Sequence, residues 1–148
     1  MSLVLNGTTG ITNLPSINSG QIGGRRNIVI NGEMKVAQRA TSATGKTGGT
    51  SGYFALDRWK LQDGTIGTAG RCTIAQIADG PAGFANCLKI SATTADTSID
   101  AREALILQTR FEGQDLQQLK KGTASAEQVT VSFYVKGNAA ALYVCELF

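Results

Sequence analysis

Strict alternation of apolar and polar residues is the feature of this sequence that most constrains its fold. It is clearest in QVTVSFYVKG, residues 128–137, where Val129, Val131, Phe133 and Val135 alternate with more polar residues. Successive side chains of a β-strand point to opposite faces, so this pattern predicts a strand with one buried face.

Similar runs recur along most of the chain and are separated by Gly, Asp-Gly or Gly-Pro. The predicted strand regions are 27–38, 52–64, 71–83, 86–93, 103–113, 128–137 and 141–148. The last run is apolar on both faces, and we expect it to be central or covered. In the first run the apolar face continues past Asn31-Gly32, which favours a bulge or kink over a tight turn.

One short helix is predicted near residues 115–121. Asp115 is a suitable N-cap, Leu116 and Leu119 are three residues apart, and Gly122 can end the helix. Seven strand regions and one short helix predict an all-β fold, an antiparallel β-sandwich over residues 27–148.

Residues 1–26 read as an extended arm rather than as part of the sandwich. Their apolar pieces are too short to bury a face of their own and are broken by Gly, Asn-Gly and Pro. A solvated tail needs no recurring Ile and Leu, so we expect the arm to order on a partner or on sister chains. The predicted anchoring residues are Leu3, Leu5, Ile11, Leu14, Ile17 and Ile22.

Composition argues against several classes of function. The sequence has no histidine, which excludes imidazole-based nucleophilic catalysis and His-ligated metals. Its three cysteines are widely spaced and are expected to be small buried thiols. A net charge of +3 without a basic cluster gives little support to nucleic-acid binding. No apolar run is long enough for a membrane span. We therefore predict a protein without metal, cofactor or enzymatic activity.

The stretch ATSATGKT, residues 40–47, fits the loose consensus of a phosphate-binding loop. Such a loop requires a buried strand before it and a helix after it. Residues 35–39 are largely polar, and Gly48-Gly49 are poor helix formers. We therefore expect a flexible Gly/Ser/Thr loop and no nucleotide binding.

Four of these segments, taken in order, resemble a jelly-roll module of bacteriophage tail fibre and other virion appendage proteins. They are Asn27–Arg39, Tyr53–Trp59, Gln108–Gly113 and Val131–Lys136, and the arm also looks like the N-terminal segments of such fibres. Thr109, within the third segment, departs from the family pattern, as does Glu33-Met34 within the first. Neither departure disturbs strand alternation.

The resemblance implies a jelly-roll sandwich and a homotrimeric virion structural protein, made in the host cytoplasm. Such a protein docks to other tail or baseplate proteins through residues 1–26 and takes part in host attachment. The alternative is a carbohydrate-binding module that recognises a host surface glycan. A jelly roll of this type carries further strands after residue 148, so either sister chains cover the last strand or the chain is the retained part of a longer fibre.

The segment Asp57-Arg58-Trp59 invites two interpretations. An aromatic ring beside a guanidinium and an acid can grip sugar hydroxyls, which makes Arg58, Trp59 and Tyr134 the candidate glycan contacts. By alternation, however, Trp59 shares a face with Leu61, and the sole Trp of a small β domain usually lies in the core. We favour the core interpretation.

Overall fold

The computed structural model describes residues 27–47, 49–64, 69–101, 103–138 and 142–147, together with the backbone of four two-residue strands before residue 27. Among these residues the regular structure is mostly β-strand, with one short helix. All strand pairs are antiparallel and the sheets are open. The predicted all-β class is confirmed.

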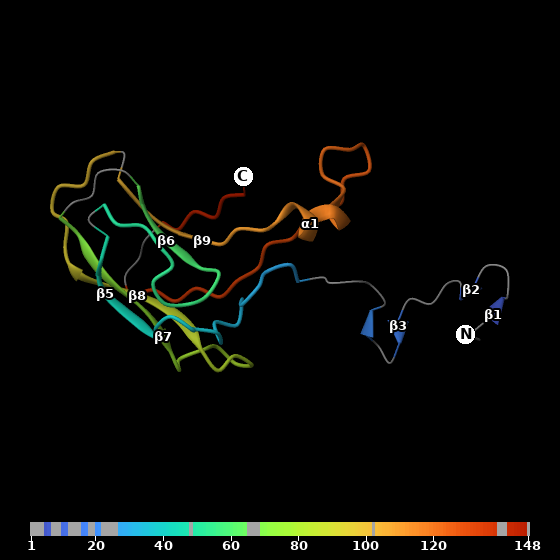
Figure 1. Ribbon diagram of the computed structural model, residues 1–148, viewed down its shortest axis with the longest axis horizontal. Coiled ribbons are helices and arrows are strands. Elements are labelled where there is room, and N and C mark those ends of the chain that lie inside the picture. Colours follow the sequence, from blue (N-terminus) through green and yellow to red (C-terminus); the bar gives the residue numbers. More distant parts are fainter. Residues whose placement is uncertain are drawn as a thin grey trace.

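Two sheets form the body of the molecule (Figure 1). The larger contains β5 (Ser42–Lys46), β7 (Arg71–Ile77) and β8 (Cys87–Thr94) in the order β5-β7-β8. The smaller pairs β6 (Lys60–Gly64) with β9 (Ala104–Gln108). β6, β7 and β9 lie within regions that alternation predicted to be strands, and β8 extends one residue beyond its predicted region.

The buried core is small and joins the two sheets. Its members are Ala55, Leu56, Leu61, Cys72 and Ile74. Leu61 comes from β6, and Cys72 and Ile74 come from β7, where alternate residues point inward. Leu88, Ile90 and Leu107 pack against this cluster from β8 and β9.

The helix begins and ends earlier than the sequence predicted. α1 spans Gly113–Leu116 and continues as the 3-10 turn η1, Gln117–Leu119. Glu112 holds the N-cap position, so the predicted cap Asp115 lies inside the helix. Left-handed backbone at Lys120 (φ 48°) ends it two residues before Gly122.

The predicted strand at 27–38 is wrong. Asn31 and Met34 both have φ of 56°, and the Met34 N–H donates to the Asn31 backbone oxygen at 3.2 Å. Asn31-Gly32 is therefore a tight turn, because Asn tolerates left-handed backbone and the turn is held by long-range contacts. In the predicted region 52–64, only Lys60–Gly64 forms a strand.

The stretch that resembles a phosphate-binding loop is largely a strand, not the flexible loop we expected. β5 covers most of it and pairs with β7 through a register shift between Ala43 and Lys46. The Lys46 ammonium lies over the Phe54 ring, 4.6 Å from its centre. The context of a nucleotide site is absent from the described residues around it, because no helix follows β5 there.

The two C-terminal strand predictions are wrong for this structure. Residues 128–138 and 142–147 are extended, but within the described residues neither segment belongs to a sheet. All described residues from 121 onward are exposed, including the segment that we expected to be covered. Alternation gives a segment the tendency to form a strand, but a strand also needs a neighbouring edge to pair with.

The arm contains two small antiparallel pairs. β1 (Leu5–Asn6) pairs with β2 (Gly10–Ile11), and β3 (Ser16–Ile17) pairs with β4 (Gly20–Gln21). Neither pair joins the sheets of the body. The side chains of the predicted anchoring residues lie outside the described part of the chain. Among the described residues, no helix is long and apolar enough to cross a membrane.

Candidate interaction surface

Large apolar side chains gather on the exposed C-terminal part of the chain. Their exposed fractions run from 41% at Val129 to 92% at Leu142. We call this set the C-terminal apolar surface: Val129, Val131, Phe133, Tyr134, Val135, Leu142, Tyr143, Val144 and Leu147. Large exposed apolar patches are typical of interaction sites, which makes this set the candidate interaction surface.

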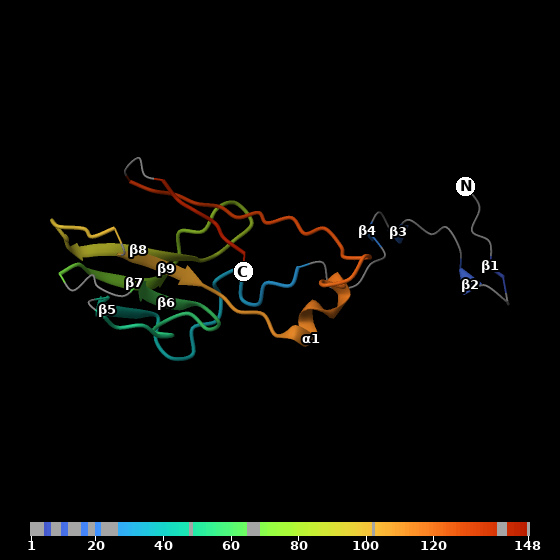
Figure 2. The same cartoon turned by 90° about the horizontal axis from the view of Figure 1, so that it is seen from above.

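Two contacts tie this surface to the loop between β7 and β8. The Tyr134 ring packs edge-on against Phe84, with centroids 5.8 Å apart. The Lys136 ammonium lies 3.3 Å from an Asp79 carboxylate oxygen, and both side chains are well exposed. An exposed ion pair contributes at most about 1 kcal/mol, so these contacts guide the segment without burying it. Figure 2 shows residues 128–138 running along one side of the sheets.

The three predicted glycan contacts each contact a different part of the molecule. Trp59 packs against the core, and its indole N–H donates to the Asn31 backbone oxygen at 3.0 Å. Arg58 has a left-handed backbone (φ 70°), and its guanidinium lies 3.8 Å from Glu112. Tyr134 is at the β7–β8 loop, as described above. The polar atom of Trp59 is thus already used inside the fold.

A row of polar side chains on the smaller sheet was missed by the sequence reasoning. The Gln108 amide donates to Gln62 Oε1 at 2.7 Å, and the Lys60 ammonium donates to the same oxygen at 3.2 Å. All three side chains are half-buried. Lys60 pairs with Gln108 across β6 and β9, on the face opposite Leu61 and Leu107. Alternation could have placed Lys60 and Gln62 on one face of β6 and Gln108 on one face of β9, but it does not give the register that brings the two strands together.

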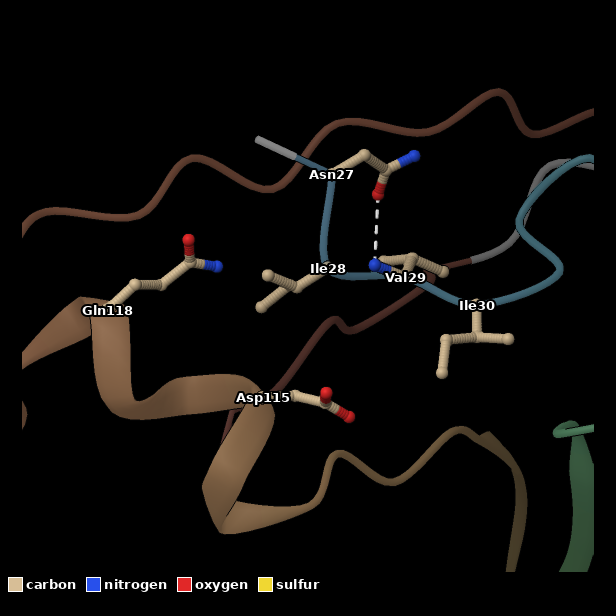
Figure 3. A pocket seen from close by; sticks show the side chains of 6 residues that line it. All are labelled: Asn27, Ile28, Val29, Ile30, Asp115 and Gln118. Carbon is tan, nitrogen blue, oxygen red and sulfur yellow. Dashed lines mark hydrogen bonds between the residues drawn. The ribbon is translucent and has the colours of Figure 1, made fainter. Parts of the chain in front are cut away.

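A cavity of about 220 Å³ lies where the arm meets the body (Figure 3). Its walls are Asn27–Ile30 on one side and Asp115 and Gln118 of the helical segment on the other. The Asn27 side chain accepts a hydrogen bond from the Val29 N–H at 2.9 Å, which fixes the backbone on this side of the cavity.

Two further expectations concern metals and thiols. The described residues hold no cluster of three or more His, Cys, Asp or Glu side chains that could bind a metal ion. Cys72 is buried, Cys87 is half-buried and Cys145 is exposed. The prediction of buried thiols is therefore right for Cys72 and wrong for Cys145, which lies in the unpaired C-terminal segment.

Comparisons with family models, with curated proteins and with solved structures found no match to this chain.

Proposed function

We propose that this chain is a structural protein of a bacteriophage virion, a tail fibre or tail appendage. It docks to the tail through residues 1–26, associates with sister chains and takes part in host attachment. The four-segment resemblance supports the phage assignment. The two antiparallel sheets are compatible with a jelly-roll sandwich completed on assembly.

The observation that carries this proposal is the mismatch between a small core and a large exposed apolar surface. Five side chains are buried in the described part of the chain, whereas the C-terminal apolar surface alone has nine exposed members. Burial of apolar area is the main driving force for association, at roughly 25 cal/mol per Å². A chain of this kind gains stability by assembling with other chains, as a virion component does.

Deleting residues 1–26 is expected to abolish attachment to the tail and to leave the body folded. None of the described strands of the body pairs with β1–β4, so the urea midpoint should stay unchanged. Attachment is measured by co-sedimentation of the tagged chain with tailed phage particles that lack this appendage. Equal co-sedimentation of the truncated and intact chains would show that the arm is not the anchor.

A second candidate function, glycan recognition, is favoured by the polar row on the smaller sheet. Gln62 and Gln108 hold their amides in a fixed arrangement beside the Lys60 ammonium. Fixed amide and ammonium donors on a sheet face suit sugar hydroxyls, because their ordering cost is already met.

Replacing Gln62 with Ala is expected to weaken glycan binding at least about tenfold if the row is the binding site, since one lost charge-assisted or paired hydrogen bond costs about 1.4 kcal/mol or more. The measurement is binding of the purified chain to a surface-glycan array, followed by titration of the best ligand. Gln114→Ala is the matched control, because that amide bonds to the exposed Glu112 carboxylate in the helical segment. An equal loss of glycan binding in both variants would argue against the polar row as the binding site.

A further inference from the structure

Residues 129–135 have the character of a strand but have no strand partner among the described residues of their own chain. Within the described residues, the segment 128–138 makes no backbone hydrogen bond to any strand. Backbone N–H and C=O groups are strong hydrogen-bonding groups that proteins pair wherever water is excluded. Water can pair with these backbone groups only while the segment stays exposed.

An edge of matching length is open in the same chain. β8 ends the three-stranded sheet, so one of its sides has no strand neighbour among the described residues. It has eight residues, CLKISATT, with Lys89 as its one charged residue and no proline. Charges and prolines are what proteins use to block sheet edges. The β8 edge is thus well suited to accept a further strand.

The direction of the chain argues against pairing of this segment with β8 of the same copy. Figures 1 and 2 show residues 128–138 running the same way as β8, from the helical end of the molecule to the far end. Pairing in place would give a parallel ladder beside β8, whereas every strand pair in this structure is antiparallel. A second copy, rotated relative to the first, can present the same segment in the antiparallel direction.

We propose that residues 129–135 of one copy add as an antiparallel strand to the free edge of β8 in a second copy of this chain. In that arrangement Val129, Val131, Phe133 and Val135 continue the inward face on which Leu88 and Ile90 already pack against the core. Ser132 and Tyr134 lie on the opposite face. A sister chain therefore covers these four inward-facing members of the C-terminal apolar surface, and the two copies are joined by a β-ladder.

The inference deepens the proposed function and rests on its statement that sister chains associate. The two ideas have separate readouts. Attachment to the tail is scored by the arm deletion, whereas strand addition is scored by the mass of the isolated intact chain. A negative result in one of these experiments would leave the interpretation of the other unchanged.

The test compares Phe133→Lys with Ser132→Lys in the intact 148-residue chain. Each variant adds one positive charge to the same exposed segment, but they place it on opposite faces. By light scattering, the unaltered chain and Ser132→Lys are expected at two or more times 15.5 kDa. Phe133→Lys is expected at 15.5 kDa, because a lysine on the inward face would be buried without a partner. Unchanged Trp59 fluorescence shows that the body stays folded.

Hydrogen exchange locates the contact. In the associated chain, the amides of residues 129–135 are expected to exchange more than about tenfold more slowly than in Phe133→Lys. In Phe133→Lys, the amides on the free edge of β8 should lose their protection together with the amides of residues 129–135. A monomeric unaltered chain would overturn the proposal. So would an oligomer in which residues 129–135 exchange freely, or one that survives Phe133→Lys.

Discussion

Replacing Asn31 with Ala is expected to lower the free energy of unfolding by about 3 kcal/mol. The Asn31 amide donates to the backbone oxygens of Val36 and Asp57, each at 2.9 Å, and its Oδ1 accepts from the Val36 N–H at 3.0 Å. Three partly exposed bonds of this kind contribute about 2 kcal/mol together. The left-handed backbone of residue 31 adds about 1 kcal/mol, because Ala tolerates it less well than Asn. The measurement is urea unfolding followed by circular dichroism at one fixed protein concentration.

Two controls separate these contributions. Asn31→Gly removes the side-chain bonds but keeps the left-handed conformation accessible, so it should cost about 1 kcal/mol less than Asn31→Ala. Asn27→Ala removes one exposed local bond, to the Val29 N–H, and should cost well under 1 kcal/mol. If Asn31→Ala were no more destabilising than Asn27→Ala, the side chain of Asn31 would not be what closes this turn.

The contacts of Asn31 join the segment at residues 27–39 to the segment at residues 53–59. Its side chain binds the Asp57 backbone, and its own backbone oxygen accepts from the Trp59 indole. The Gln76 side chain of β7 adds two further hydrogen bonds by donating to the backbone oxygens of Met34 and Lys35. The turn and the Asp-Arg-Trp segment are therefore two halves of one structural unit, which gives Trp59 a role in folding whatever else it contacts.

Alternation located the paired strands well where the local pattern and the tertiary partner agree. β7 and β8 alternate inward and outward residues as the sequence suggested, and Ile74 and Leu88 lie on the inward side. It failed at residues 27–38, because Asn31 forms a turn there through side-chain bonds to Val36 and to the distant Asp57, and the Gln76 side chain binds the same segment. No local pattern contains the two distant partners, Asp57 and Gln76. β5 was missed for the opposite reason: its sequence, SATGK, is rich in residues typical of loops, and pairing with β7 overrides that tendency.

The candidate sites show the same limit. The apolar face of residues 129–135 could be read directly from the sequence, but its exposure could not, since exposure depends on which edge is available nearby. The polar row of Lys60, Gln62 and Gln108 depends on the register between β6 and β9, and strands 46 residues apart give no sequence signal for that register. The placement of Trp59 against the core followed from its face and its size.

Replacing Gly80 with Ala is expected to destabilise the body by about 3 kcal/mol, at the upper end of overpacking costs. A Cβ at this position would lie 2.3 Å from the Phe84 backbone oxygen and 2.9 Å from that of Asn86. Both atoms belong to the loop backbone, which is closed by the Phe84 N–H donating to the Pro81 oxygen at 2.9 Å. The loop must therefore shift as a unit, and thermal unfolding would measure the cost.

Two other glycines distinguish crowding from backbone conformation as the cause. Gly83, in the same loop, has φ of 90° but open space around its Cβ position, so Gly83→Ala should cost only about 1 kcal/mol. Gly113 has open space and no left-handed backbone, and Gly113→Ala should be neutral or slightly stabilising in α1. A Gly80→Ala chain as stable as Gly113→Ala would mean that the loop is looser than its contacts indicate.

If the loop does shift, Phe84 moves with it, and the ring contact that guides Tyr134 should weaken at the same time. Gly80→Ala would then disturb the C-terminal apolar surface without altering any residue of that surface.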